Sequence, residues 1–484
     1  MDFITSEYYI WFLPIVFLLT FTVGQKQRRR QIAILMVSSY VFFWMASGWH
    51  MLLLLTSTLV DWTAGKKIHE AEEQKIRKKW LIGSLTVNLG LLAVFKYLDF
   101  LIESWNWASL RISSAPEMDT FGLLLPVGIS FYTFQTMSYT IDIYRGKNKP
   151  YDDLLSFSCY AAFFPQLVAG PIVRAEHFRE QINQTLTPDP MRFRLGLTLI
   201  VYGLAKKLII ADNVAIHVNE IFVEGAPLDN MGLVWWGAIA FGIQIYCDFS
   251  AYTDIAIGSA LLFGIRLPEN FDSPYVATSP QEFWRRWHIS LSTWLRDYLY
   301  IPLGGSRNGP IVMLFALMMT MLLGGLWHGA SWNFVLWGLL HGLLLIAHRL
   351  LLKLQFIHTI FERLPKIAPI TGWIVTQYFV FMTWLVFRVE DTSILITSLK
   401  TYIGIGAHWG SEEMYYALPE IKFLTFAIAM LFFIGHFISW KIGGIKNWIA
   451  EQNSLVWGLV IGIMLSLAFL LRPAETVDFI YFRF

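Results

Sequence analysis

Long apolar segments separated by short polar ones recur along the whole of this chain. The apolar runs cover residues 8–23, 32–47, 81–102, 195–211, 231–247, 311–327, 332–347, 373–387, 421–439 and 455–471. A membrane-spanning helix needs about 17–25 residues, and most of these runs approach that length. Because lipid offers no hydrogen-bond partner to backbone groups, helices are the expected spanning element. The pattern predicts an all-α polytopic membrane protein with about ten or eleven spans, plus re-entrant or interfacial helices.

The composition agrees with a protein surrounded by lipid. Only 15% of the 484 residues are charged and 56% are hydrophobic, whereas soluble proteins carry about 25% charged residues. The first apolar run lacks the basic start and the small-residue cleavage site of a signal peptide, so we interpret it as a mature span. With no repeat or long linker in the sequence, we expect one membrane domain over residues 1–484, with its polar motifs at about 240–348.

Basic loops predict the orientation of the chain. Residues 25–30 read QKQRRR and residues 65–79 read GKKIHEAEEQKIRKK, with two apolar stretches between them. Lys and Arg favour the cytoplasmic side, and both loops can lie there only if the N-terminus is outside. RGKNK at 145–149 fits a third cytoplasmic loop, and the acidic segment 408–416 suits the outer side. These short connections do not indicate nucleic-acid binding.

Metal sites and disulfide frameworks are not indicated. Cys159 and Cys247 both lie in apolar surroundings, which predicts two buried free thiols. His341 and His348 share a helix face, but no acidic or thiol partner stands three or four residues from them. We therefore expect these two histidines to be packing or interfacial residues, with no metal and no permanently bound cofactor.

A polar cluster at residues 267–307 contains the first candidate site residue. Ser279, Pro280 and Glu282 form a helix start, which predicts a helix over 280–300. Helical spacing places His288 on its aromatic face. An interfacial amphipathic helix would explain the arginines of this segment, but it would not explain a histidine on the buried face.

The second candidate lies between two apolar runs, in the sequence LLGGLWHGASWNFVLWGLLHG at 322–342. His328 belongs to a small, flexible stretch that predicts a break between two helices. Ionisable residues inside membrane proteins are costly and indicate function. In this interpretation His328 faces a reactant. In the alternative, its side chain only forms a hydrogen bond with the backbone at the end of a helix.

These motifs resemble those of the membrane-bound O-acyltransferases, in their bacterial alginate O-acetyltransferase branch. The resemblance covers nearly the whole chain. The segments that carry it are LPVGISFYTFQTMSYTIDIYRG, FFPQLVAGPIVR, IQIYCDFSAYTDIAIG, the region 267–307, the region 322–342 and the ending FIYFRF.

The resemblance implies a helical bundle of the membrane-bound O-acyltransferase type and a role for each histidine. His328 corresponds to the catalytic histidine of the WHG motif, and His288 to the family's other signature histidine. The implied reaction is acyl transfer from a cytoplasmic thioester, acetyl-CoA, to a hydroxyl, with a periplasmic partner protein modifying an exported polysaccharide such as alginate. The expected location is the bacterial inner membrane. Trp327, Asn333 and Asp297, which stand near the two histidines in sequence, are candidate substrate-path residues.

The chemistry expected of such a centre is compatible with these residues. A neutral imidazole can take the proton of an attacking hydroxyl, while a covalent acyl-histidine is a second route. D-alanyl transfer to teichoic acid, a transporter or flippase without chemistry, and a catalytically silent scaffold are the alternatives. The YIPLGGSR sequence favours the acetylating branch, and the presence of His328 argues against a scaffold.

Overall fold

The computed structural model describes residues 2–112, 117–168, 170–355, 363–409, 422–474 and 477–482. These residues are predominantly helical and contain no strand, which confirms the predicted fold class. The chain forms two compact units. Unit 1 comprises residues 1–200 and 255–268, and unit 2 comprises residues 201–254 and 269–484. The expectation that the whole chain acts as one domain stays a prediction.

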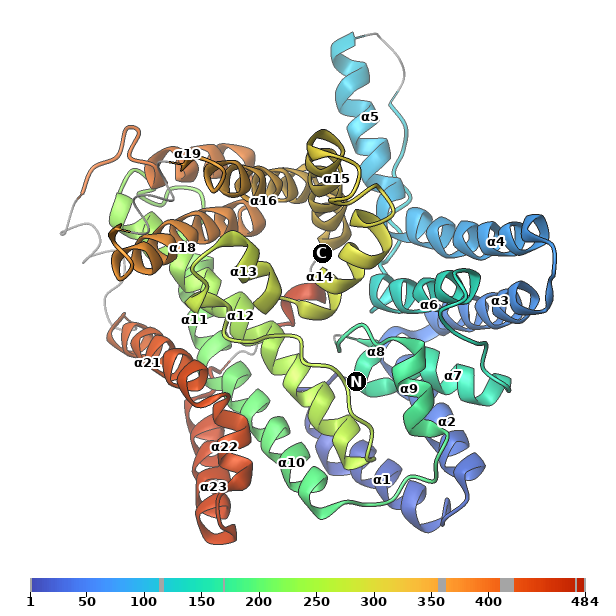
Figure 1. Cartoon of the computed structure of the whole chain (residues 1–484). Coiled ribbons are helices and arrows are strands. Elements are labelled where there is room, and N and C mark those ends of the chain that lie inside the picture. The colour runs from blue at the N-terminus through green and yellow to red at the C-terminus, as the bar shows by residue number, and fades with distance from the viewer. Residues whose placement is uncertain are drawn as a thin grey trace. The chain divides into compact units, whose positions relative to one another are not determined.

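Unit 1 contains the N-terminal helices (Figure 1). They are η1 (Tyr8–Phe12), α1 (Leu13–Thr22), α2 (Arg28–Ser47), η2 (Gly48–His50), α3 (Met51–Glu70), α4 (Gln74–Leu92), η3 (Ala93–Tyr97), α5 (Leu98–Ile112), α6 (Ile129–Tyr144), α7 (Leu154–Ala162), α8 (Phe164–Leu167), α9 (Ala175–Ile182) and most of α10 (Pro190–Ala205). Buried Asp61 on α3 accepts hydrogen bonds from Ser84 Oγ at 2.6 Å and Asn88 Nδ2 at 2.8 Å, both on α4. These bonds join the two helices where no water is available.

Unit 2 contains the segments in which both candidate histidines lie. Its elements are η4 (Lys206–Ala211), α11 (Asp212–Ile221), most of α12 (Met231–Leu262), η5 (Pro274–Val276), α13 (Pro280–Arg286), α14 (Ile289–Leu295), η6 (Arg296–Tyr300), α15 (Pro310–His328), α16 (Trp332–Leu351), α18 (Ile367–Arg388), α19 (Thr392–Tyr402), α21 (Lys422–Ile442), α22 (Ile445–Glu451), α23 (Ser454–Leu471) and η7 (Ile480–Phe482).

Within the described ranges, eight helices are long and apolar enough to span a membrane. This number is smaller than the expected ten or eleven. One reason is that Arg28–Glu70 counts once although it includes both α2 and α3, and another is that Tyr8–Thr22 is shorter than the others. Burial differs between spans. In α12, 72% of the apolar 18-residue stretch is buried within the protein, compared with 6% of the corresponding stretch in α23. Helix α12 is therefore a core element, whereas α23 has the exposed apolar surface expected of a lipid-facing helix.

Two predictions about local structure were wrong in detail. The helix expected over 280–300 is interrupted at His288, whose φ of +42° lies in the left-handed region. The break expected at His328 begins one residue later, so that His328 ends α15. Residues 410–416 of the acidic segment 408–416 lie outside the described residues, and both cysteines are buried and free as predicted.

Glycines bring α15 and α16 together (Figure 1). A methyl group on Gly338 would overlap the backbone carbonyl of Met321, and one on Gly325 would overlap the carbonyl of Phe334. Small residues allow such close approach between membrane helices. The backbone contact fixes the position of His328 at the end of α15.

We expect Gly338→Ala to destabilise the protein, because forcing extra volume into a packed interface costs about 1–3 kcal/mol. The measurement is thermal unfolding of the purified protein in detergent. Gly458→Ala on α23 is the matched control, since nothing lies within 4 Å of a methyl group there. Equal unfolding temperatures for the two variants would contradict the close-packing account.

Candidate active site

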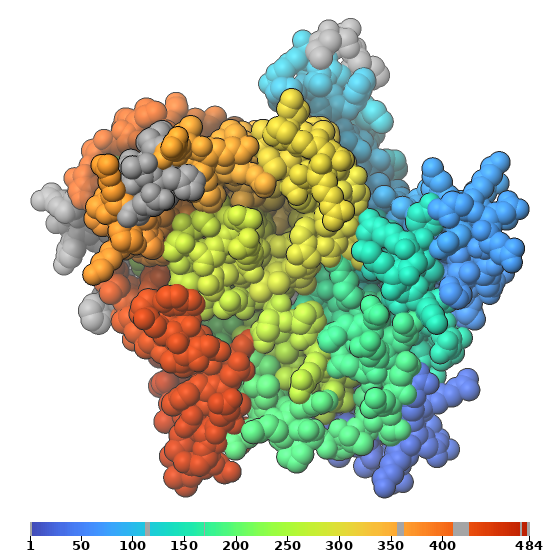
Figure 2. All heavy atoms as spheres, viewed as in Figure 1, coloured from blue at the N-terminus to red at the C-terminus, as the bar shows by residue number. Residues whose placement is uncertain are grey.

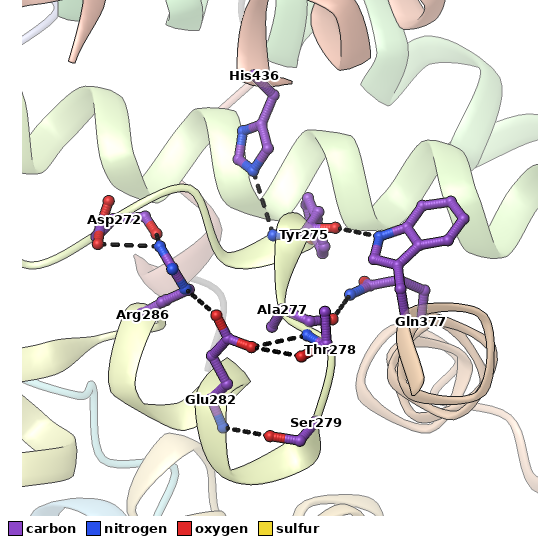
Figure 3. Close-up of polar contacts among 10 residues, drawn as sticks. Asp272, Tyr275, Ala277, Thr278, Ser279, Glu282, Arg286, Gln377 and His436 are labelled. Carbon is purple, nitrogen blue, oxygen red and sulfur yellow. Dashed lines mark hydrogen bonds and ion pairs between the residues drawn. The ribbon is translucent and has the colours of Figure 1, made fainter. Parts of the chain in front are cut away.

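Helix α13 is held at its start by a hydrogen-bonded network (Figure 3). Ser279 Oγ accepts from the backbone N–H of Glu282 at 3.1 Å, which confirms the predicted cap. Glu282 Oε2 accepts from the backbone N–H and the hydroxyl of Thr278, each at 2.9 Å. Arg286 bridges Glu282 and Asp272, with both ion pairs at 3.0 Å.

These contacts keep Glu282 ionised. Partial burial would raise the pKa of its carboxyl group, but the hydrogen bonds from Thr278 and the nearby Arg286 guanidinium together hold that pKa below its ordinary value. The preceding turn is attached to α18 and α21: Gln377 Nε2 donates to the Ala277 carbonyl at 3.0 Å, and His436 Nε2 accepts from the Tyr275 N–H at 3.2 Å (Figure 3). The segment that presents His288 is therefore fixed on several sides.

His288 is fully buried where α13 ends and α14 begins. Asn270 causes the interruption, because its backbone carbonyl accepts from Ile289 N at 2.9 Å and its side-chain oxygen accepts from Ser290 N at 3.1 Å. The same oxygen lies 3.2 Å from His288 Nδ1 and accepts from Ser290 Oγ at 2.9 Å. Because an amide oxygen can only accept hydrogen bonds, the His288 nitrogen that faces it must donate. The proton of the neutral ring is therefore assigned to Nδ1, and Nε2 is an acceptor.

His328 reaches the same region from the last turn of α15, and it is also buried. Its ring centroid lies 6.5 Å from that of His288. The rings of Trp327 and Trp337 lie 5.1 Å and 4.9 Å from the His328 ring. The two histidines are thus neighbours in one buried aromatic surrounding.

Tyr481 contacts His328 from the C-terminal segment. Its hydroxyl lies 3.2 Å from His328 Nδ1. The tyrosine ring also packs on Phe249 of α12, with 4.5 Å between centroids, and Phe249 lies 4.7 Å from the His288 ring. The site is therefore built from α12, the turn between α13 and α14, the end of α15 and the chain's last described turn.

A buried ionic cluster attaches this C-terminal segment to the rest of unit 2. Lys207 Nζ lies 2.8 Å from carboxylate oxygens of both Asp212 and Asp248, and it donates to the Val477 carbonyl at 2.7 Å. The other oxygen of Asp248 accepts from the backbone N–H of Ile480 at 2.8 Å. Because Ile480 precedes Tyr481, the cluster positions the tyrosine hydroxyl.

The three candidate substrate-path residues have different surroundings. Trp327 is buried, and its ring lies 5.7 Å from that of His288. Asn333 donates to the Val389 carbonyl at 2.7 Å, which joins the start of α16 to the end of α18. Asp297 forms an ion pair with the adjacent Arg296 at 2.9 Å. The structure thus brings Trp327 to the histidines, and the roles of all three residues stay predictions.

His341 lies in the place expected of a packing residue. It is buried on α16, its Nε2 lies 3.0 Å from Thr383 Oγ1, and its ring is 4.5 Å from Trp337. Sequence reasoning did not single out Asn270, Lys207, Asp248 or Tyr481 as site residues. The available signals were polar residues within apolar runs and the FIYFRF ending, whose residues 483–484 lie outside the described residues.

Several known proteins are similar to this chain in sequence. The profile of the membrane-bound O-acyltransferase family matches residues 151–389. The chain is 37% identical to "Probable alginate O-acetylase" of Pseudomonas aeruginosa, over 89% of this chain and 80% of the relative. It is 32% identical to the peptidoglycan O-acetyltransferase of Helicobacter pylori, over 93% and 91% respectively. Identity to the teichoic acid D-alanyltransferase of Bacillus subtilis is 26%, over 51% and 64%.

The helical membrane fold and these relatives define an acyltransferase of the membrane. The chain belongs to the membrane-bound O-acyltransferase family, and within it to the alginate O-acetylase-like branch. It is therefore a multi-pass membrane enzyme that transfers acyl groups to oxygen.

We expect Lys207→Met to destabilise the protein markedly, because it leaves two buried carboxylates without their shared cation. Breaking a buried ion pair typically costs about 3–5 kcal/mol. Lys400→Met is the control, since Lys400 lies exposed on α19. Thermal unfolding of both variants checks this, and an unfolding temperature of Lys207→Met equal to that of the control would refute the anchoring role.

Proposed function

We propose that this chain transfers acetyl groups from cytoplasmic acetyl-CoA to a hydroxyl, for O-acetylation of an exported polysaccharide such as alginate. The observation that carries the proposal is the meeting of His288 and His328 in one buried aromatic site. The names of the relatives support acetyl as the acyl group. D-alanyl transfer is less favoured, because identity to the teichoic acid enzyme is lower and covers about half of the chain.

His328 fits the role of general base. In this role its Nδ1–H donates to the Tyr481 oxygen, and its Nε2 removes the proton of the attacking hydroxyl. The hydroxyl oxygen then bonds to the thioester carbonyl carbon, the carbon–sulfur bond breaks, and the departing thiolate receives the proton from the imidazolium. General base catalysis of this kind is worth about 10²–10⁴-fold in rate.

His288 supplies an acceptor rather than a donor. Because Asn270 Oδ1 accepts a hydrogen bond from Nδ1–H, Nε2 of the neutral ring can accept a hydrogen bond. This favours orientation of a hydroxyl or of the neighbouring imidazole over stabilisation of the thioester carbonyl. A covalent acyl intermediate on histidine stays an alternative route.

Two openings flank the histidines in unit 2. One is a cavity whose lining includes Ile289, the residue after His288. The other is a small cleft whose lining includes Ile480, the residue before Tyr481, and Arg388 at the end of α18. Arg349, near the end of α16, lines the first opening, whereas the start of α16 lies at the second, where Asn333 bonds to Val389. The first opening has a volume of about 500 Å³ and the second about 20 Å³, so the first is the better candidate for a substrate entrance.

The proposed setting is the bacterial inner membrane, with the N-terminus outside and a periplasmic partner protein receiving the acetyl group. The two bacterial relatives and the apolar helices support this location. The positions of the basic loops at 25–30 and 65–79 support the orientation.

We expect His328→Ala to lower acetylation by about 10²-fold or more, because the general base is lost. The measurement is acetylation of polymer or partner in membranes with matched protein amounts. His341→Ala is the matched control, since both histidines are buried and both contact Trp337. The two variants should lose similar stability, while only the first loses turnover. Acetylation by His328→Ala at the level of the control would refute the catalytic assignment.

A reporter fused after Arg30 should behave as cytoplasmic, because the basic loop at 25–30 favours that side. Paired fusions to alkaline phosphatase and green fluorescent protein measure this. Alkaline phosphatase activity without fluorescence would place the loop outside and overturn the orientation.

A further inference from the structure

Residues 98–124 of unit 1 connect two neighbouring helices that run antiparallel. Arg77, near the start of α4, donates to the carbonyl of Tyr144 at the end of α6 at 3.0 Å. At the other end of this pair, Lys96 on η3 donates to Ser130 on α6 at 3.3 Å. The connection therefore leaves and returns at the same end of the helix pair.

That end of the helix pair lies at a membrane surface. Helices α4 and η3 have 19 and 5 residues, and at 1.5 Å per residue they extend about 36 Å together. The hydrocarbon core is about 30 Å thick, so a helix that begins within the basic loop at 65–79 has crossed it by Tyr97. Helix α5 then carries Asp99, Glu103 and Asn106, which suits a position outside the core. The connection therefore lies at the membrane face opposite the basic loops.

Side chains of α5 tie the connection into a hairpin. Asn106 bonds to both the N–H and the carbonyl of Met118, at 2.9 Å and 2.8 Å. Asp99 accepts from the N–H groups of Phe121 and Gly122 at 2.8 Å and 2.9 Å. We call α5 with residues 117–124 the α5 hairpin. Figure 1 shows α5 leading away from α3, α4 and α6, and Figure 2 shows its light-blue surface as a projection.

Large apolar side chains cover the outside of the α5 hairpin. Those that are more than half exposed are Leu101, Trp105, Trp107, Leu110, Met118, Phe121 and Leu124. Exposed apolar surface of this extent marks an interaction surface. Since the hairpin lies at a membrane face, the occupant of this surface is either lipid or another protein.

The two sides of α5 differ in charge. One side carries an apolar stripe at the helical spacing i, i+4, i+7, which consists of Leu101, Trp105 and Ala108. The other side carries Glu103, Trp107 and Arg111 at the spacing i, i+4, i+8, and the Arg111 guanidinium lies 3.9 Å from the centroid of the Trp107 ring. One apolar side and one charged side are typical of helices that lie in a membrane interface.

We propose that the α5 hairpin lies in the lipid headgroup layer, with Leu101, Trp105 and Ala108 toward the hydrocarbon and with Glu103 and Arg111 toward water. Lipid is favoured over a protein partner because α5 begins where the core ends, and because tryptophan is enriched at membrane interfaces. The inference concerns how the enzyme is held in the bilayer and does not depend on the identity of the acyl group.

Spin labels on single introduced cysteines test this position in nanodiscs of phosphatidylethanolamine and phosphatidylglycerol. The measurement compares collisions with oxygen, which concentrates in lipid, and with a water-soluble nickel chelate. Cys159 and Cys247 are fully buried, and wild-type protein taken through the labelling gives the background. Ile463→Cys, exposed near the middle of α23, is the reference for hydrocarbon. Lys147→Cys, exposed in a basic loop, is the reference for water.

We expect a label at Trp105→Cys to lie between the two references, immersed by about 5–10 Å at the boundary of headgroups and acyl chains. A label at Glu103→Cys should be more accessible to the nickel chelate than to oxygen. The two positions form a matched pair, because both side chains are exposed on the same helix and they lie on opposite sides of it.

The double variant Leu101→Asp/Trp105→Asp tests whether the stripe holds the hairpin in lipid. It should move a label at Ala108→Cys toward the water reference, because a charged stripe no longer favours the acyl chains. Glu103→Gln, on the opposite side, should leave that label where it is. The unfolding temperature in detergent should match that of wild type, since the substituted side chains are exposed.

Three results would overturn the interfacial position. A label at Trp105→Cys that the nickel chelate reaches as readily as the one at Lys147→Cys would place the hairpin in water. A label at Trp105→Cys that neither probe reaches would assign the stripe to a protein partner or to a second copy of the chain. A label at Ala108→Cys whose depth is unchanged in the double variant would show that the stripe does not bind lipid.

Discussion

A buried polar group in a membrane protein must find its hydrogen-bond partners within the protein, because the surrounding lipid supplies none. The candidate site depends on this constraint at each histidine. His288 is bonded by Asn270, and His328 contacts the hydroxyl of Tyr481. Each partner is itself fixed: Asn270 caps the start of α14, and the segment with Tyr481 is attached through Lys207 and Asp248.

The same bonds decide which imidazole nitrogen can act. Asn270 Oδ1 accepts a hydrogen bond from His288 Nδ1, so that Nε2 of His288 is an acceptor. The Tyr481 hydroxyl lies at Nδ1 of His328, and in the proposed reaction Nε2 of His328 faces the reactant. Backbone contacts at Gly325 and Gly338 hold the helix that carries His328. Helix packing, hydrogen bonding and the proposed proton transfer are thus linked through a few residues.

The sequence was sufficient to predict the elements with strong local signals. Apolar runs of spanning length gave the helices, and Ser279 with Pro280 gave the start of α13. Ionisable residues in apolar segments singled out His288 and His328, the motif resemblance gave each a role, and both are buried in one site. The family and the acyltransferase activity predicted from those motifs are confirmed by the relatives.

Features that depend on distant partners could not be predicted. The interruption at His288 requires Asn270, eighteen residues earlier, to take over the first N–H groups of α14. Nothing in the sequence of residues 280–300 predicts that hydrogen bond. Likewise, Tyr481 reaches His328 from 153 residues away in sequence. The sequence around Asn333 likewise gave no sign that its amide bonds to the carbonyls of Val389 and Glu390, and its substrate-path role stays a prediction.

The central claim is that His288 and His328 form one acyl-transfer centre, and a double-mutant cycle tests it most directly. The measurement is kcat/KM for acetyl transfer in His288→Gln, His328→Gln and the double variant, with matched amounts of folded protein. Residues that act as a unit have strongly non-additive effects. The account predicts that the double variant is about as impaired as the worse single variant. Losses that multiply would mean that the two histidines act independently, which would contradict a shared centre.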